Sequence, residues 1–168
     1  MKLTESQRAR LQELTYESYV EELPEADWES RRQALLGEIS DPFELHVFAM
    51  NVNWDGGTED LEWVLNHEEC DLGTALMIYA YGSPGYYYRK QEKGDQLHDY
   101  ETDAWNFLKS IEQKVSAGAF KQGKVAFDPR DPNGDDHYRV NSANPGNRLV
   151  PEAMKKPTQG DTIENPTI

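Results

Sequence analysis

A chain of 168 residues with a formal net charge of −14 has room for one domain and one hydrophobic core. This acidity excludes the basic footprint that nucleic acids and anionic membranes require, and no apolar run reaches the roughly 18 residues that span a bilayer. A single cysteine, Cys70, excludes an intrachain disulfide and a cysteine zinc cluster. Because the N-terminus has no segment of the signal-peptide type, we expect a cytoplasmic protein, and no residue pattern calls for a cofactor.

The first forty residues predict two helices. Thr4 and Gln7 fit a capping box, and apolar residues at helical spacing follow, which predicts a helix from about residue 5 to about residue 22. Pro24 can occupy the first turn of a second helix. Trp28 lies on the apolar stripe of that helix, and Gly37 marks its end.

Three further helix starts follow in the middle of the chain. Residues 41–44 (Asp-Pro-Phe-Glu) combine an N-cap, a proline at the first helical position and a capping-box glutamate. The segment 54–57 (Trp-Asp-Gly-Gly) ends this helix, and Thr58 begins another. Asp71 is the predicted N-cap of the next one.

Beyond residue 80 the pattern predicts a turn, a helix and a tail. Residues 81–88, rich in Gly, Pro and Tyr, are typical of a turn. A long helix from about Thr102 to about Ala117 carries Trp105 and further apolar residues at steps of three and four. From about Lys121 prolines become frequent and no period persists, which indicates an extended strap. Its plausible anchors are Phe127, Tyr138, Leu149, Val150 and Met154.

These elements predict an all-α fold in which antiparallel helical hairpins stack in one domain, followed by an extended, Pro-rich C-terminal tail. We expect the helical domain over residues 1–120 and the tail over residues 121–168. Too few apolar side chains are present in the tail for a core of its own, so we expect it to be partly docked on the helices and partly disordered. Disorder is expected beyond about Pro157.

The most distinctive motifs are 51–57 (Asn-Val-Asn-Trp-Asp-Gly-Gly) and 70–76 (Cys-Asp-Leu-Gly-Thr-Ala-Leu). They resemble a family of small bacterial domains of unknown function marked by an Asn-Trp-Asp-x-Gly turn and a Cys-Asp-Leu-Gly-Thr-Ala-Leu helix start. The resemblance covers roughly residues 41–82, and some family members resemble immunity partners of bacterial toxins. We expect a structural role for the residues of this signature, which are Trp54, Asp55, Gly56, Cys70, Asp71 and Gly73.

Within the turn, each signature residue has an expected task. Asp55 bonds the backbone of its own turn, while Gly56 or Gly57 supplies a positive φ. Trp54 packs as a lid on the core.

The negative charge is concentrated in the first half of the chain. Residues 1–71 hold 18 acidic and 5 basic residues, whereas residues 72–168 hold 13 and 12. Such a field steers a cationic protein partner, and it equally serves solubility alone. Candidate contacts on the acidic face are Glu17, Glu21, Glu25 and Glu29.

A second candidate contact surface is the cluster Tyr86, Tyr87, Tyr88 and Arg89. Tyrosine and arginine are enriched at binding hot spots. The alternative is that these tyrosines only close the edge of the core.

A catalytic or metal site is the competing interpretation. Cys70 with His67, three residues before it, or with His46, invites a thiol-nucleophile interpretation, although no oxyanion site or orienting third residue is evident. A metal site formed by Asp55, Glu59, Asp60 and His67 lacks ligand spacing, and a structural role for these residues is favoured. The segment 128–136 does not fit an EF-hand but leaves weak calcium binding open.

The sequence therefore favours a protein-binding module without catalysis, bound to a cationic protein. The resemblance makes an immunity-type inhibitor of a cationic bacterial toxin domain the more specific expectation. A small hydrolase or metal-dependent enzyme centred on Asp55, Cys70 and His46 is the first alternative, and a housekeeping adaptor domain is the second.

Overall fold

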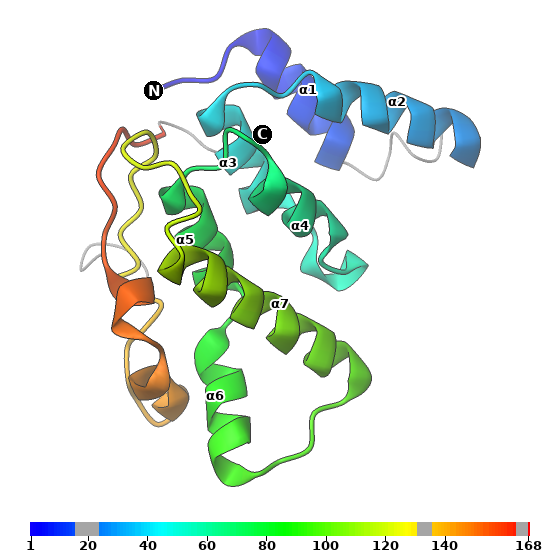
Figure 1. Cartoon of the computed structure of the whole chain (residues 1–168). Coiled ribbons are helices and arrows are strands. Elements are labelled where there is room, and N and C mark those ends of the chain that lie inside the picture. Colours follow the sequence, from blue (N-terminus) through cyan, green and yellow to red (C-terminus); the bar gives the residue numbers. More distant parts are fainter. Residues whose placement is uncertain (16–23, 131–135, 164–167) are drawn as a thin grey trace.

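The structure, a computed structural model, describes residues 1–15, 24–130, 136–163 and 168 (Figure 1). Over these residues it is a single all-α domain with seven α-helices and no strands, which confirms the expected fold class. The helices are α1 (Glu5–Thr15), α2 (Glu25–Gly37), α3 (Pro42–Asn51), α4 (Glu59–Asn66), α5 (Leu72–Tyr81), α6 (Pro84–Lys93) and α7 (Asp99–Ser116). Short 3-10 turns are η2 (Trp54–Gly56), η3 (Pro145–Leu149) and η4 (Glu152–Lys155). None of the described helices has the length and apolarity to cross a membrane.

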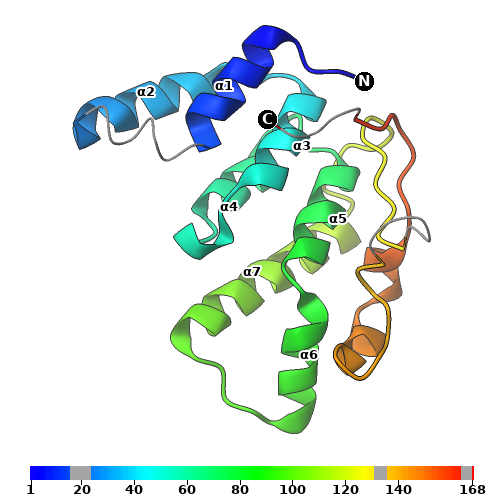
Figure 2. The same ribbon diagram turned by 180° about the vertical axis from the view of Figure 1, so that it is seen from behind.

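Helix α5 forms the centre of the core. All of its residues from Gly73 to Ala80 are buried, because the helix is apolar around its whole circumference. Helix α3 packs against it and is buried from Phe43 to Ala49. Helix α1 covers α3, and α7 crosses α5, so α1 and α2 lie at one end of the molecule and α6 at the other (Figures 1 and 2).

The predicted helix starts are confirmed at their caps. Thr4 and Gln7 form a reciprocal capping box, with donor–acceptor distances of 2.9 and 3.3 Å. The Asp41 carboxylate accepts two backbone N–H groups of the first turn of α3, at 2.9 and 3.0 Å. The expected second half of that box is wrong, because the Glu44 carboxylate binds Arg10 of α1 instead. Burial raises the pKa of Glu44, while Arg10 opposes this shift.

The predicted turn over residues 81–88 is wrong from Pro84 onward, where α6 begins. Ser83 adopts a left-handed conformation with φ of 54°, and Pro84 occupies the first helical position. Gly94, with φ of 71°, ends the helix. The glycine and proline signals are therefore helix boundaries, between which Tyr86, Tyr87 and Tyr88 continue the helix.

Two helix boundaries differ from the prediction, and a third is not described. Helix α1 is described to Thr15, and the rest of the expected helix to residue 22 lies outside the described residues. Pro24 is the N-cap of α2 and does not enter its first turn. Helix α7 begins three residues earlier than expected because the Glu101 side chain accepts the His98 backbone N–H at 2.9 Å.

The C-terminal segment packs on the helices through the predicted anchors. Tyr138, Val150 and Met154 are buried, and Phe127 and Leu149 are half-buried. The segment runs beside α5 and α6, on the side of the molecule away from α4 (Figures 1 and 2). Its contacts continue past Pro157: the Thr158 N–H donates to the Phe127 carbonyl at 2.9 Å, and the Asp161 N–H to the Lys124 carbonyl at 2.9 Å.

The helix start at Asp71 is also a docking point for this segment. One carboxylate oxygen of Asp71 accepts the Gly73 N–H at 3.0 Å, and the other accepts the Lys124 N–H at 3.1 Å. The Leu72 N–H donates to the Lys121 carbonyl at 2.8 Å. Gly73 lets the chain approach so closely that a Cβ there would lie 2.2 Å from the Val125 carbonyl oxygen. The Cys-Asp-Leu-Gly motif thus caps α5 and holds the C-terminal segment.

A second docking point joins α6 to η3. A Cβ added to Gly85 would lie 1.9 Å from the Asn147 side-chain oxygen, and one added to Gly146 would lie 1.9 Å from the Gly85 carbonyl oxygen. The Asn147 amide donates to the carbonyls of His137 and Arg139, at 3.1 Å each. Two glycines therefore allow a backbone-to-backbone contact that side chains would prevent.

Candidate functional site

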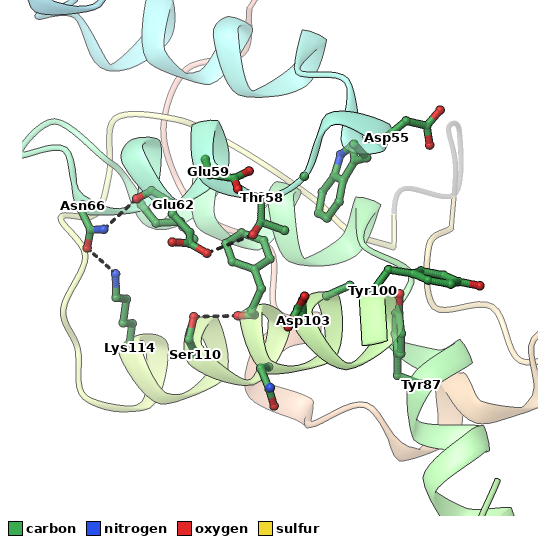
Figure 3. A pocket seen from close by; sticks show the side chains of 16 residues that line it. Asp55, Thr58, Glu59, Glu62, Asn66, Tyr87, Tyr100, Asp103, Ser110 and Lys114 are labelled. Carbon is green, nitrogen blue, oxygen red and sulfur yellow. Dashed lines mark hydrogen bonds between the residues drawn. The ribbon is translucent and has the colours of Figure 1, made fainter. Parts of the chain in front are cut away.

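A groove with a volume of about 980 Å³ lies between α4 and α7 (Figure 3). The turn η2 and the start of α4 supply one wall, and the face of α7 from Tyr100 to Lys114 supplies the other. This face follows from helical spacing, because residues 100, 103, 107, 110 and 114 recur at steps of three and four. We call this hollow the α4–α7 groove.

The floor of the groove is apolar. Phe107 and Leu65 are buried at its base. Trp54 of η2 packs edge-on against Phe107, with ring centroids 6.1 Å apart and planes at 73°. Tyr87 of α6 lines the groove next to α7 and stacks on Trp105, with ring centroids 5.9 Å apart.

Four carboxylates line the groove from both walls. They are Asp55 on η2, Glu59 and Glu62 on α4, and Asp103 on α7, and all four are exposed. The Thr58 hydroxyl donates to Glu62 at 3.0 Å and orients it. Lys114 is the one basic residue among the described residues that line the groove. The groove therefore carries a negative field over an apolar floor.

The two ends of the groove differ. At one end, the Lys114 ammonium donates to the Asn66 side-chain oxygen at 2.7 Å, which links α7 to α4 (Figure 3). At the other end, Tyr100 is 72% exposed and stacks on His98 with ring centroids 5.7 Å apart. The end closed by Lys114 and Asn66 is thus the less acidic one, and the end near Trp54 and Tyr100 is aromatic.

Such a surface is suited to binding a cationic, partly apolar ligand. Carboxylates attract lysine and arginine, and exposed aromatic rings stack on cations and on aliphatic stems. A large apolar floor next to a charged rim is typical of a protein-binding surface.

The predicted acidic face lies elsewhere. Glu25 and Glu29 are exposed on α2, and Glu29 accepts a hydrogen bond from Gln33 at 2.9 Å. Neither lines the groove. Glu17 and Glu21 fall on residues 16–23, outside the described residues.

The predicted tyrosine cluster is divided between internal bonds and the groove. The Tyr86 hydroxyl donates to Glu101 at 2.5 Å, and the Tyr88 hydroxyl donates to Glu112 at 2.8 Å. Only Tyr87 of this cluster lines the α4–α7 groove. Arg89 lies against Gly146 of the C-terminal segment, because a Cβ on that glycine would be 2.9 Å from the Arg89 Cβ.

Lys90 adds a salt bridge to this tyrosine cluster. Its ammonium donates to Glu101 at 2.6 Å. This bond is the main reason why the pKa of Glu101 is lowered to about 2, and the Tyr86 hydroxyl contributes to the same shift. Tyr86 and Tyr88 are therefore bonded to the buried carboxylates of Glu101 and Glu112 on α7.

The residues of the enzyme hypothesis lie in different surroundings. Cys70 is buried, and burial together with the Asp71 charge raises its pKa to about 12. His46 is buried on α3 and shares a hydrogen bond of 3.0 Å with the Thr74 hydroxyl, and burial lowers its pKa to about 4. Asp55 is exposed in the groove, which neither Cys70 nor His46 lines.

The alternative metal ligands also separate. Asp60 forms a salt bridge with Arg32, and the His67 ring nitrogen accepts the Glu69 N–H at 3.1 Å. Among residues 1–15, 24–130, 136–163 and 168, no three His, Cys, Asp or Glu side chains are grouped to hold a metal ion. Part of the segment 128–136 lies outside that range.

The signature turn is built differently in detail from the expectation. The side chain that bonds its backbone is that of Asn53, which accepts the Asp55 N–H at 3.0 Å. The positive φ is supplied by Gly57, at 104°, and Gly56 lies within η2. Trp54 packs on the core while half-exposed, so it forms both a partial lid and a groove wall.

Sequence reasoning missed Glu62, Tyr100 and Asp103 as site residues. For Tyr100 and Asp103 the available signal was their spacing with Ser110 and Lys114, because it defines a second, polar face on α7 beside its apolar stripe. That this face opposes α4 depends on tertiary packing.

Comparison with known families locates the groove within a recognised domain. Residues 40–116, which span α3 to α7 and both walls of the groove, match a domain of unknown function, DUF4274. Helices α1 and α2 and the C-terminal segment lie outside the match. Searches of curated proteins and of solved structures found no match to this chain.

Proposed function

We propose that this protein is a binding module without catalysis, and that it receives a cationic segment of a partner protein in the α4–α7 groove. The observation that carries the proposal is the placement of Asp55, Glu59, Glu62 and Asp103 around an apolar floor. A basic partner gains both a faster encounter and apolar burial at such a site. The groove lies within residues 40–116, which match the domain, whereas the acidic residues of α2 lie outside.

The more specific form of the proposal is an immunity-type inhibitor of a cationic bacterial toxin domain. The resemblance of the two signature motifs to the bacterial family supports it, as does the concentration of acidic residues in the first 71 positions. An acidic groove would bind the basic surface with which such a toxin holds an anionic substrate. A housekeeping adaptor would use the same groove for another basic partner, and only the identity of the partner separates the two.

The hydrolase alternative receives less support. A thiol nucleophile acts as a thiolate, and a pKa of about 12 keeps Cys70 protonated at neutral pH. His46, with a pKa of about 4, is neutral, but its ring nitrogen already faces Thr74 inside the core. Neither side chain reaches the groove, where a substrate would enter.

The proposal is tested by affinity purification of the tagged protein from its native host, with two matched double variants. Glu62→Gln with Asp103→Asn removes two groove charges, and Glu25→Gln with Glu29→Gln removes two charges from α2. We expect a basic protein to be retained at low salt by the wild type and the α2 variant, and to be lost from the groove variant. Equal retention by both variants, or retention that 0.5 M salt does not weaken, would contradict the proposal.

A further inference from the structure

We infer that the occupant of the α4–α7 groove is an amphipathic α-helix of the partner, about four turns long, with lysine or arginine on both sides of an apolar stripe. The inference rests on the proposed function, because it names the form of the cationic segment. It follows from three features of the groove: the nature of its walls, their length, and the distribution of charge across them.

The walls offer no backbone partners to an extended segment. Helices α4 and α7 bond their own N–H and C=O groups, so a strand lying between them would find no sheet edge to pair with. Its backbone groups would be desolvated over the apolar floor without partners, which is unfavourable. A helix satisfies its backbone internally and presents side chains only, which is the helix-in-groove mode of recognition.

The length of the groove suits a short helix. The α7 wall from Tyr100 to Lys114 rises by roughly 21 Å at 1.5 Å per residue, which corresponds to about 14 residues of a helix lying alongside it. The opposite wall consists of η2 and the eight-residue helix α4 (Figure 3). The α4–α7 groove therefore has a place for one further helix in the layer formed by its two walls.

The charges predict the pattern on that helix. Glu59 and Glu62 stand on one wall and Asp103 on the other (Figure 3), and the apolar lining includes the packed rings of Trp54 and Phe107. A matching helix carries apolar residues at i, i+3, i+4 and i+7, and basic residues on both flanks. Lys114 repels basic residues at the closed end, so the basic residues should lie toward the Tyr100 end.

Synthetic peptides test the inference on the full-length protein. The test peptide is a labelled peptide of about 16 residues with leucines at i, i+3, i+4 and i+7 and flanking lysines. One control peptide has the same composition in scrambled order. The other control peptide keeps the order but carries a central proline. Fluorescence anisotropy gives each affinity. We expect the helical peptide to bind at least about tenfold more tightly than either control peptide. Only the helical peptide presents the apolar stripe while its backbone groups are hydrogen-bonded within the helix.

Variants separate this inference from the proposed function. The groove variant, Glu62→Gln with Asp103→Asn, should lower the affinity for the helical peptide by about fivefold. The α2 variant, Glu25→Gln with Glu29→Gln, should leave this affinity unchanged. Lys114→Gln should raise it by about twofold, because it removes a like charge. If all three peptides bind equally well and the groove variant weakens each of them, the inference that the ligand is a helix is wrong. The proposal that the groove binds a cationic segment then still stands. Failure of every peptide to bind, or binding insensitive to the groove variant, would overturn the proposed function with it.

Discussion

Replacing Gly73 with alanine should detach the C-terminal segment from the start of α5. Residue 73 is buried in the first turn of the helix, and its added Cβ would lie 2.2 Å from the Val125 carbonyl oxygen and 3.0 Å from the Thr158 hydroxyl. Ordinary contact begins at 3.4 Å, so the two backbones must separate by about 1 Å. Because the neighbour is backbone, no side-chain rotation relieves the overlap.

The cost follows from the contacts that this separation strains. The Leu72 N–H bond to Lys121 and the Lys124 N–H bond to Asp71 span the same junction, and each contributes about 0.5–1.5 kcal/mol. Overpacking adds about 1–3 kcal/mol, while alanine regains about 1 kcal/mol of helix propensity over glycine. These terms together give a net loss of about 1–5 kcal/mol in the free energy of unfolding, with a central value of about 3 kcal/mol.

Thermal or urea unfolding measures this loss, with Gly37→Ala as the matched control. Gly37 is also a helical glycine, but nothing lies within 4 Å of its Cβ position, so its replacement should be neutral or stabilising by up to about 1 kcal/mol. For a chain of this length, the Gly73 variant should melt about 4–10 °C lower. A Gly73→Ala protein as stable as the wild type would refute the close junction between α5 and the C-terminal segment.

Three other changes test the account. Asp71→Asn keeps the α5 cap but turns an amide toward the Lys124 N–H, so the free energy of unfolding in urea should fall by about 1–2 kcal/mol. Asp71→Ala removes both bonds and should cost about twice as much. Equal losses in the two variants would argue against the bond from the Lys124 N–H to Asp71. Trp54→Ala should cost about 1–3 kcal/mol in the same assay, less than a buried tryptophan, because the ring is half-exposed; no loss would exclude its packing on the core. Burial lowers the pKa of His46 in the folded protein to about 4, below the ordinary histidine value of 6.5. The unfolded state therefore binds the proton first, and stability should fall as the pH drops from about 6.5 to about 4. His46→Gln should flatten that stretch of the pH–stability curve, and an unchanged slope would show that another group causes it.

Local signals predicted the helix starts, because capping depends on residues within one turn. Asp41 and Asp71 bond the N–H groups two or three residues onward, as their sequence positions indicate. The same kind of signal gave a wrong prediction at Pro84, where a helix begins instead of a turn. Glycine and proline occur both in turns and at the ends of helices. Local chemistry alone does not distinguish the two.

The groove and the docking points depend on packing between distant residues. Gly73 meets Val125, and Gly85 meets Gly146, across more than fifty residues of chain. Their roles as points of close approach leave no local pattern, whereas Asp103 belonged to a readable polar face whose partner wall was unknown. Prediction therefore succeeded for the described helices other than α6 and for the apolar anchors of the C-terminal segment, and it failed where two surfaces must first meet.

The central claim is that a cationic segment binds between α4 and α7, and mapping of backbone amide shifts tests it most directly. The ¹⁵N-labelled protein would be titrated with the lysine-rich helical peptide at low salt. The account predicts that shifts concentrate on residues 54–66 and on the α7 face that includes Asp103 and Phe107, while α2 is unaffected. Shifts concentrated on α2 around Glu25 and Glu29, or spread evenly over the acidic surface, would contradict it.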